Sequence, residues 1–190
     1  MVDFRYNAFM KKYLLEIARD AIKEELTGKK VLDEEALVKA HPELAKKWAT
    51  FVTLEKDQRL RGCIGSLVSH RSLLEDIISN AKSAAFRDPR FDPLKEVEFD
   101  KLSVEVSLLT EPKKLEYKDK EDLRAKIKVG IDGIVLKADG RQATFLPQVW
   151  EQLGDFDQFF LHLCQKAALH GGCLELHPDI YTYQVEKIKE

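Results

Sequence analysis

The segment from Leu60 to Gly65 reads L-R-G-C-I-G and places a cation, a thiol and two glycines side by side. Alternate side chains of an extended strand share a face, so we expect Arg61 and Cys63 to lie together, about 7 Å apart, with Leu60 and Ile64 facing the core. A guanidinium at that distance favours the thiolate, which is the nucleophilic form of cysteine. The glycines would leave room for a ligand to approach the backbone.

Three interpretations of this segment stay open. Cys63 could be the nucleophile of an enzyme. Alternatively, the segment could form a ligand- or partner-binding surface built from Arg61, Gly62, Cys63, Ile64 and Gly65, in which the planar fork of Arg61 engages an anionic group. The third interpretation is structural, because free cysteines are often buried and glycines within strands often mark a bulge or close packing.

Other candidates for a site are weaker. The loop from Asp88 to Pro93 has two prolines four residues apart, so it is constrained, and Asp88 and Arg90 could pair with each other or with a ligand. His162 lies off the apolar stripe of its helix and is expected at the edge of a cleft, whereas Cys164 lies on that stripe as a core thiol.

The histidine and cysteine spacing predicts no metal site, and the common nucleotide-binding and hydrolase motifs do not occur.

The charge balance, the apolar runs and the cysteines limit the class of protein to which this chain can belong. The charges nearly cancel, with 31 Lys and Arg against 33 Asp and Glu, so nucleic acid is not favoured as a partner. No run approaches the roughly 20 apolar residues of a membrane span, and charged residues stand where a signal peptide has its apolar core. The three cysteines, Cys63, Cys164 and Cys173, form no C-x-x-C pair and favour reduced thiols. We therefore expect a cytoplasmic protein.

Hydrophobic periodicity predicts the elements that must position these residues. Helices are expected over residues 6–26, 33–39, 72–86, 119–127 and 155–167. Strands are expected over residues 49–54, 61–64, 102–109, 134–136, 143–146 and 180–188. The turns at 56–58 and 139–140 join the strands beside them into two hairpins.

The order of these elements predicts an internal duplication. A hairpin, a capped helix and a later strand occur over residues 54–109 and again over 134–188, and 54–59 aligns with 136–141 without a gap. Continuing that register places Arg61, Gly62, Cys63 and Gly65 opposite Ala143, Thr144, Phe145 and Pro147. The second copy would then lack every reactive group, which favours a functional reason for the first.

Four motifs in order resemble the AMMECR-type domain, a family named for a human chromosomal region linked to Alport syndrome with elliptocytosis. They are L-R-G-C-I-G at 60–65, D-P-R-F at 88–91, L-P-Q-V at 146–149 and F-L-H-L-C-Q-K-A at 160–167, which resembles the F-L-x-x-L-C-x-K-A helix of the family. Asp92 departs from the pattern, since relatives often carry an apolar residue or proline there.

The resemblance implies an α+β fold with two lobes, a pseudo-symmetric duplication and mixed or antiparallel sheets. It implies one AMMECR-type domain over residues 1–190, with amino-terminal helices at 6–48, one repeat at about 49–110 and another at about 130–188. It also implies a functional site at L-R-G-C-I-G beside a cleft, without a known cofactor. Bacterial and archaeal relatives are often encoded with Memo-type proteins and radical S-adenosylmethionine enzymes, which implies that these are partners in a shared pathway.

Overall fold

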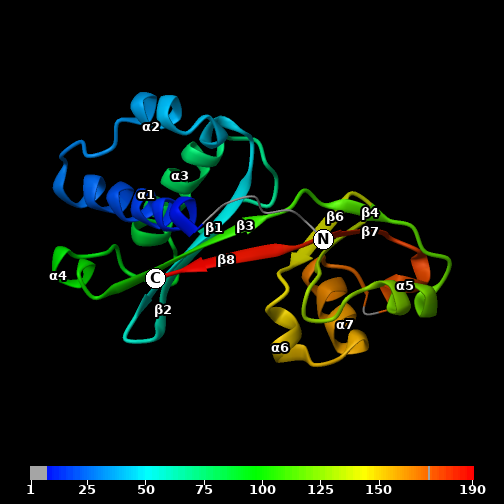
Figure 1. Ribbon diagram of the computed structural model, residues 1–190. Coiled ribbons are helices and arrows are strands. Elements are labelled where there is room, and N and C mark those ends of the chain that lie inside the picture. The colour runs from blue at the N-terminus through cyan, green and yellow to red at the C-terminus, as the bar shows by residue number, and fades with distance from the viewer. Residues whose placement is uncertain (1–7, 171) are drawn as a thin grey trace. The chain divides into compact units, whose positions relative to one another are not determined.

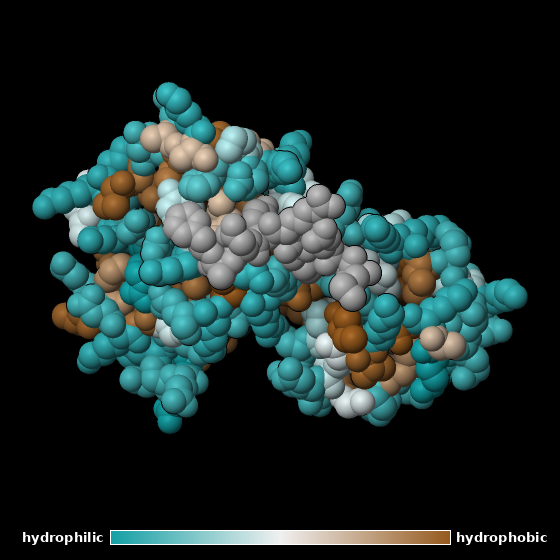
Figure 2. Space-filling view, in the orientation of Figure 1, coloured by the Kyte–Doolittle hydropathy of each residue, from teal (hydrophilic) through white to brown (hydrophobic). Residues whose placement is uncertain are grey.

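The computed structural model describes residues 8–170 and 172–190 as an α+β protein with two units. The first unit contains the chain up to Glu111 together with Glu186–Glu190, and the second contains Pro112–Val185. Hydrophilic residues cover most of the visible face of both units (Figure 2). Among the described residues, no helix combines the length and the apolar composition needed to cross a bilayer.

The first unit has one four-stranded sheet with helices on one of its faces (Figure 1). The strand order is β2-β1-β3-β8. Its strands are β1 (Ala49–Lys56), β2 (Arg59–Gly65), β3 (Leu102–Leu109) and β8 (Val185–Lys189). Its helices are α1 (Ala8–Thr27), α2 (Glu34–Ala40), the 3₁₀ helix η1 (Pro42–Ala45), α3 (Leu73–Phe86) and α4 (Glu96–Phe99).

Local signals set the ends of the helices in the first unit. Gly28, at φ +67°, ends α1 as expected for a C-cap glycine. The side chain of Ser72 accepts from the backbone of Glu75 and the Glu75 side chain accepts from Ser72, so the predicted capping box begins α3. The apolar stripes of α1 and α3 pack against β1 and β3 in one core. The predicted start of α1 at Tyr6 lies outside the described residues.

The second unit also has a four-stranded sheet, in the order β4-β7-β5-β6. Its strands are β4 (Lys113–Leu115), β5 (Gly133–Ala138), β6 (Arg141–Phe145) and β7 (Asp179–Tyr183). Its helices are α5 (Lys120–Lys126), α6 (Val149–Leu153), α7 (Phe156–Lys166) and the 3₁₀ helix η2 (Cys173–Leu176). The rings of Trp150 and Phe159 stack at 3.5 Å in its core.

The carboxyl-terminal strand differs from the prediction. Residues 180–188 were expected as one strand, but the structure divides them at Gln184 into β7 and β8, which belong to different sheets. No glycine or proline interrupts this stretch, so no turn signal marks the change of partner. The last residues of the chain therefore return to the sheet of the first unit.

The expected state of two cysteines is also wrong. Cys164 at the end of α7 and Cys173 in η2 form a disulfide, and both are buried. Cys63 is the cysteine that remains free. The absence of a C-x-x-C pair could not reveal this bond, because the chain turns back after α7 and brings together two residues nine positions apart.

The two sheets have a similar order of elements. This similarity supports the predicted duplication, which stays a proposal. Each has a hairpin, β1–β2 or β5–β6, beside a strand that follows the next helices, β3 or β7. The gapless alignment of the hairpins is wrong beyond Leu60, however. Leu54 pairs with Gly62 as Leu136 pairs with Ala143, so Cys63 corresponds to Thr144 and Arg61 has no counterpart.

Candidate functional site

A β-bulge lies within L-R-G-C-I-G. Leu54 pairs with Gly62 and Glu55 pairs with Leu60, which leaves Arg61 as the extra residue of β2. An extra residue shifts the alternation of inward and outward side chains by one position. Leu60 is accordingly 45% exposed, so the prediction that it faces the core is wrong.

The guanidinium of Arg61 is held by α4. Its Nε donates to Glu98 Oε1 at 3.2 Å and its Nη2 donates to Glu98 Oε2 at 3.1 Å, while Nη2 also donates to the backbone carbonyl of Asp92 at 2.9 Å. The side chain of Arg61 is only 12% exposed. Its planar fork, which we expected to meet an anionic ligand, is therefore occupied by a carboxylate of the same unit.

Glu98 joins two cations near the end of the β1–β2 hairpin. Besides Arg61, Lys56 donates to its carboxylate at 2.8 Å. Hydrogen bonds from Arg61 and then from Lys56 lower the pKa of Glu98 to about 2, against the opposing effect of burial. The departure of Asp92 from the family pattern does not disturb this contact, because Arg61 uses the backbone of Asp92 and not its side chain.

Both glycines of the segment are explained by packing. A Cβ added to Gly62 would overlap the carbonyl oxygen of Ala84 in α3, and one added to Gly65 would overlap the ring of Phe51. The space that we expected on the Cβ side is thus filled by protein. Ile64 packs against the core, as predicted. These residues shape the strand, and their contact with a ligand stays a prediction.

Asp88 and Arg90 bind the backbone of Cys63. The Cys63 N–H donates to Asp88 Oδ2 at 2.8 Å, and Arg90 Nη2 donates to the Cys63 carbonyl at 3.2 Å. Arg90 also donates to Asp88 through Nε at 2.9 Å and Nη2 at 2.6 Å. Because β2 is an edge strand, this pair takes the place of a neighbouring strand and closes the edge at Cys63.

The Asp88–Arg90 pair is buried at one end and open at the other. The side chain of Asp88 is 1% exposed and that of Arg90 is 52% exposed. The hydrogen bond from Arg90, joined by those from the backbone of Cys63 and of Arg90, keeps the pKa of Asp88 well below its usual value although burial opposes this. Arg90 therefore combines a fixed position with an accessible guanidinium.

The Cys63 side chain lies in a polar row across three strands. Thr53 is opposite Cys63 in β2 and opposite Glu105 in β3, and these three side chains are half-buried. The Thr53 hydroxyl donates to the Cys63 sulfur at 3.3 Å. The row thus places a thiol and a carboxylate on either side of one hydroxyl group.

A buried carboxylate anchors the segment that follows Gly65. Asp76 of α3 accepts from the backbone and hydroxyl of Thr50, and from the side chains of Ser66, Arg71 and Asn80. Neither this group nor Glu98 was predicted from the sequence. Asp76 and Asn80 stand on the apolar stripe of α3, and this spacing was the available signal that they bond inside the protein.

The remaining predicted site residue belongs to the second unit. His162 is exposed on α7, while its neighbour Cys164 faces the core in the disulfide. The structure therefore brings together Arg61, Cys63, Asp88 and Arg90 within the first unit, and it places His162 on a different body. The described residues contain no group of three His, Cys, Asp or Glu side chains arranged to hold a metal ion.

Comparison with known proteins gives a consistent result. The family model described as AMMECR1 matches residues 15–188. A protein of Methanothermobacter thermautotrophicus is 38% identical over 180 residues, covering 93% of this chain and 92% of that protein. A protein of Saccharolobus solfataricus is 43% identical over 169 residues, covering 85% and 73%.

The fold has a counterpart among solved structures. The crystal structure of an uncharacterized protein from Pyrococcus horikoshii matches with a TM-score of 0.84 and 36% identity, covering 98% of this chain and 94% of that one. The names of these three relatives state no activity. On the family model, the sequence relatives and the shared fold, this chain belongs to the AMMECR1 family.

Proposed function

We propose that this chain is a binding protein whose surface around Cys63 receives a small ligand or a segment of a partner protein. The observation that carries the proposal is the Asp88–Arg90 pair, which holds the Cys63 backbone and leaves Arg90 half-exposed. Arg90 can bind an anionic group without losing its place, because Asp88 fixes one edge of its guanidinium. Arg90 thus takes the role that we first expected of Arg61.

The proposed partners are a Memo-type protein and a radical S-adenosylmethionine enzyme, and the resemblance to the AMMECR-type domain supports them. We also propose a cytoplasmic location. The expected reduced state of all three cysteines no longer supports that location, since Cys164 and Cys173 are bonded. The balanced charge of the chain gives no reason to add nucleic acid to the partners.

The test compares variants of two exposed arginines. The tagged full chain is purified from its own source as wild type, Arg90→Gln and Arg59→Gln, and the co-purified proteins and retained small molecules are identified by native mass spectrometry. Arg59 is the matched control because it is an exposed cation of β2, the strand that contains Cys63, and lies outside the Asp88 contact. We expect Arg90→Gln to lose the bound component and Arg59→Gln to retain it. Equal retention by both variants would show that the Cys63 surface is not the binding site.

A second candidate is an enzyme with Cys63 as its nucleophile. The Cys63–Thr53–Glu105 row favours it, because the Thr53 hydroxyl donates to the Cys63 sulfur and would stabilise a thiolate, while the Glu105 carboxylate lies one strand further on. Alkylation of the native chain by iodoacetamide is measured between about pH 5 and pH 9, with Cys63→Ser as the blank. An activated thiol reacts faster than a model thiol at the acidic end of this range. A rate that matches the model thiol throughout excludes this candidate.

A further inference from the structure

The two edge strands of the first unit's sheet differ in whether their outer backbone groups are bonded. At β2, Asp88 and Arg90 close the edge by binding the backbone of Cys63. At β8, the outer edge pairs with no further strand among the described residues. An uncovered edge presents backbone N–H and C=O groups that can pair with another chain. The β8 edge is therefore the candidate for an interaction.

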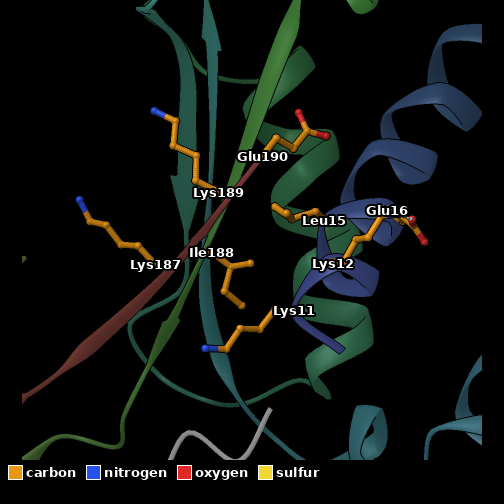
Figure 3. Close-up of a pocket in the computed structure, with 8 residues that line it drawn as sticks. All are labelled: Lys11, Lys12, Leu15, Glu16, Lys187, Ile188, Lys189 and Glu190. Carbon is orange, nitrogen blue, oxygen red and sulfur yellow. Dashed lines mark ion pairs between the residues drawn. The ribbon is translucent and has the colours of Figure 1, made fainter. Parts of the chain in front are cut away.

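A groove of about 750 Å³ runs between β8 and α1 (Figure 3). It is lined by Lys11, Lys12, Leu15 and Glu16 of α1 and by Lys187, Ile188, Lys189 and Glu190. Successive side chains of a strand point to opposite faces, so four consecutive residues can line one groove only along the edge of the strand. The groove thus exposes the edge of β8 itself.

The backbone of β8 has groups free to point into this groove. The N–H of Glu190 donates to the carbonyl of Val104 in β3. Backbone groups of alternate residues point to the same side of a strand, so those of Ile188 also point to β3 and those of Lys187 and Lys189 point away from it. An added strand would find its hydrogen-bonding partners at these two lysines.

The side chains beside the edge differ between the two faces of the sheet. Figure 3 shows Leu15 pointing from α1 toward β8, and Ile188 lies on this apolar side; both are buried. Lys187 and Lys189 extend to the other side of the strand and are exposed. Lys189 is paired with Glu55, whereas Lys187 has no recorded ion pair within the described part of the chain. The α1 side of the groove therefore has an apolar floor that is already buried, beside the charged side chains of Lys11, Lys12 and Glu16, and the opposite face carries the exposed Lys187 and Lys189.

We propose that the β8 edge binds an extended segment of a partner protein in which acidic and apolar residues alternate. The segment adds a fifth strand to the sheet, with its backbone bonded to Lys187 and Lys189. Its apolar side chains lie on the α1 side, above the buried Leu15 and Ile188, and its acidic side chains lie opposite Lys187 on the other face. Charge complementarity selects this occupant over a basic segment.

Fluorescence anisotropy with synthetic peptides tests the proposal on the full chain. The probe is a fluorescein-labelled peptide of about eight residues in which Glu and Val alternate, a length sufficient to span β8. Its counterpart alternates Lys and Val, and a third peptide has proline at two central positions to remove backbone donors. We expect the acidic peptide to bind at least about tenfold more tightly than either of the others. Equal affinities for the acidic and basic peptides overturn the proposal.

Charge reversal locates the binding. Lys187→Glu should weaken the acidic peptide by about tenfold or more and improve the basic one. Lys101→Glu is the matched control, an exposed lysine of the same unit away from the groove, and should change neither. An unchanged affinity in Lys187→Glu refutes the site. Light scattering gives a second refuting outcome: a wild-type dimer that Lys187→Glu dissociates. In that case a second copy of the chain, and not a partner protein, would occupy the edge. Tighter binding of single-stranded DNA than of the acidic peptide also refutes it.

Discussion

The backbone N–H of Cys63 donates a 2.8 Å hydrogen bond to the carboxylate of Asp88, 25 residues further along the chain. A buried side chain thereby replaces the neighbouring strand that an edge residue lacks. The position of the free thiol depends on this contact and on the Arg90 contact to the Cys63 carbonyl.

The first prediction concerns local opening at Cys63. Asp88→Asn should speed hydrogen exchange of the Cys63 amide by about tenfold or more, because a neutral amide oxygen accepts more weakly and Arg90 loses its ionic partner. Hydrogen–deuterium exchange of peptides covering β2 measures this. Asp92→Asn, which removes an exposed carboxylate of the same loop, is the control. Equal exchange in the two variants would show that Asp88 does not hold the strand.

The second prediction concerns pH. The pKa of Glu98 is about 2 in the folded protein, below the ordinary value of 4.5, so the folded state favours the charged carboxylate. Its stabilising effect is complete above about pH 4.5 and is lost as the pH falls toward 2. Glu98→Gln should lower the free energy of unfolding by about 1 to 2 kcal/mol at pH 7 and by progressively less below pH 4.5. Urea unfolding across this range measures the difference, and a constant difference would contradict the assigned ion pairs.

The third prediction concerns Arg61. Arg61→Ala should lower the free energy of unfolding by about 2 to 4 kcal/mol, because it leaves Glu98 and the Asp92 carbonyl without their shared donor. Arg61→Lys should recover only part of this, since an ammonium cannot form the bidentate contact. The matched control is Arg59→Ala in the exposed part of β2. Thermal and urea unfolding give the values. A stable Arg61→Ala that instead lost ligand binding would return Arg61 to the role of a ligand contact.

The fourth prediction concerns Gly62. Gly62→Ala should destabilise the protein by about 3 kcal/mol, because the new methyl group would overlap the backbone of Ala84 and force α3 away from the sheet. Gly172→Ala is a control at a glycine with φ −89° and no atom nearer than 3.7 Å to the added carbon. Its stability should stay close to that of the wild type. Similar melting temperatures for both variants would contradict the close approach of α3.

The fifth prediction concerns the cysteines. Denatured, unreduced protein should show one reactive thiol per chain, Cys63, and three after reduction. Reduction should also lower the free energy of unfolding by about 2 to 3 kcal/mol, the loop-closure effect of a short disulfide loop. Thiol titration and unfolding with and without reductant measure both. Three thiols before reduction would show that Cys164 and Cys173 are unbonded.

Much of the fold could be predicted because its signals are local. The Ser72–Glu75 capping box, the Gly28 C-cap and the two hairpin turns each depend on residues within one turn of chain, and the structure confirms them. Motifs of four to eight residues were likewise enough to indicate the family. In each case the information lies in residues adjacent in the chain.

The arrangement of the candidate site depended on contacts between distant residues. Only the pairing of β1 with β2 shows that Arg61 is an extra residue, because hydrophobic alternation does not locate a bulge. Only the folded chain brings Glu98 to Arg61, across 37 residues, and gives the two ends of 180–188 different sheets. The sequence by itself determined the local motifs, among them the L-R-G-C-I-G segment around Cys63. Tertiary structure decided their roles, because an arginine binds whichever carboxylate the fold places within reach, here Glu98 for Arg61 and Asp88 for Arg90.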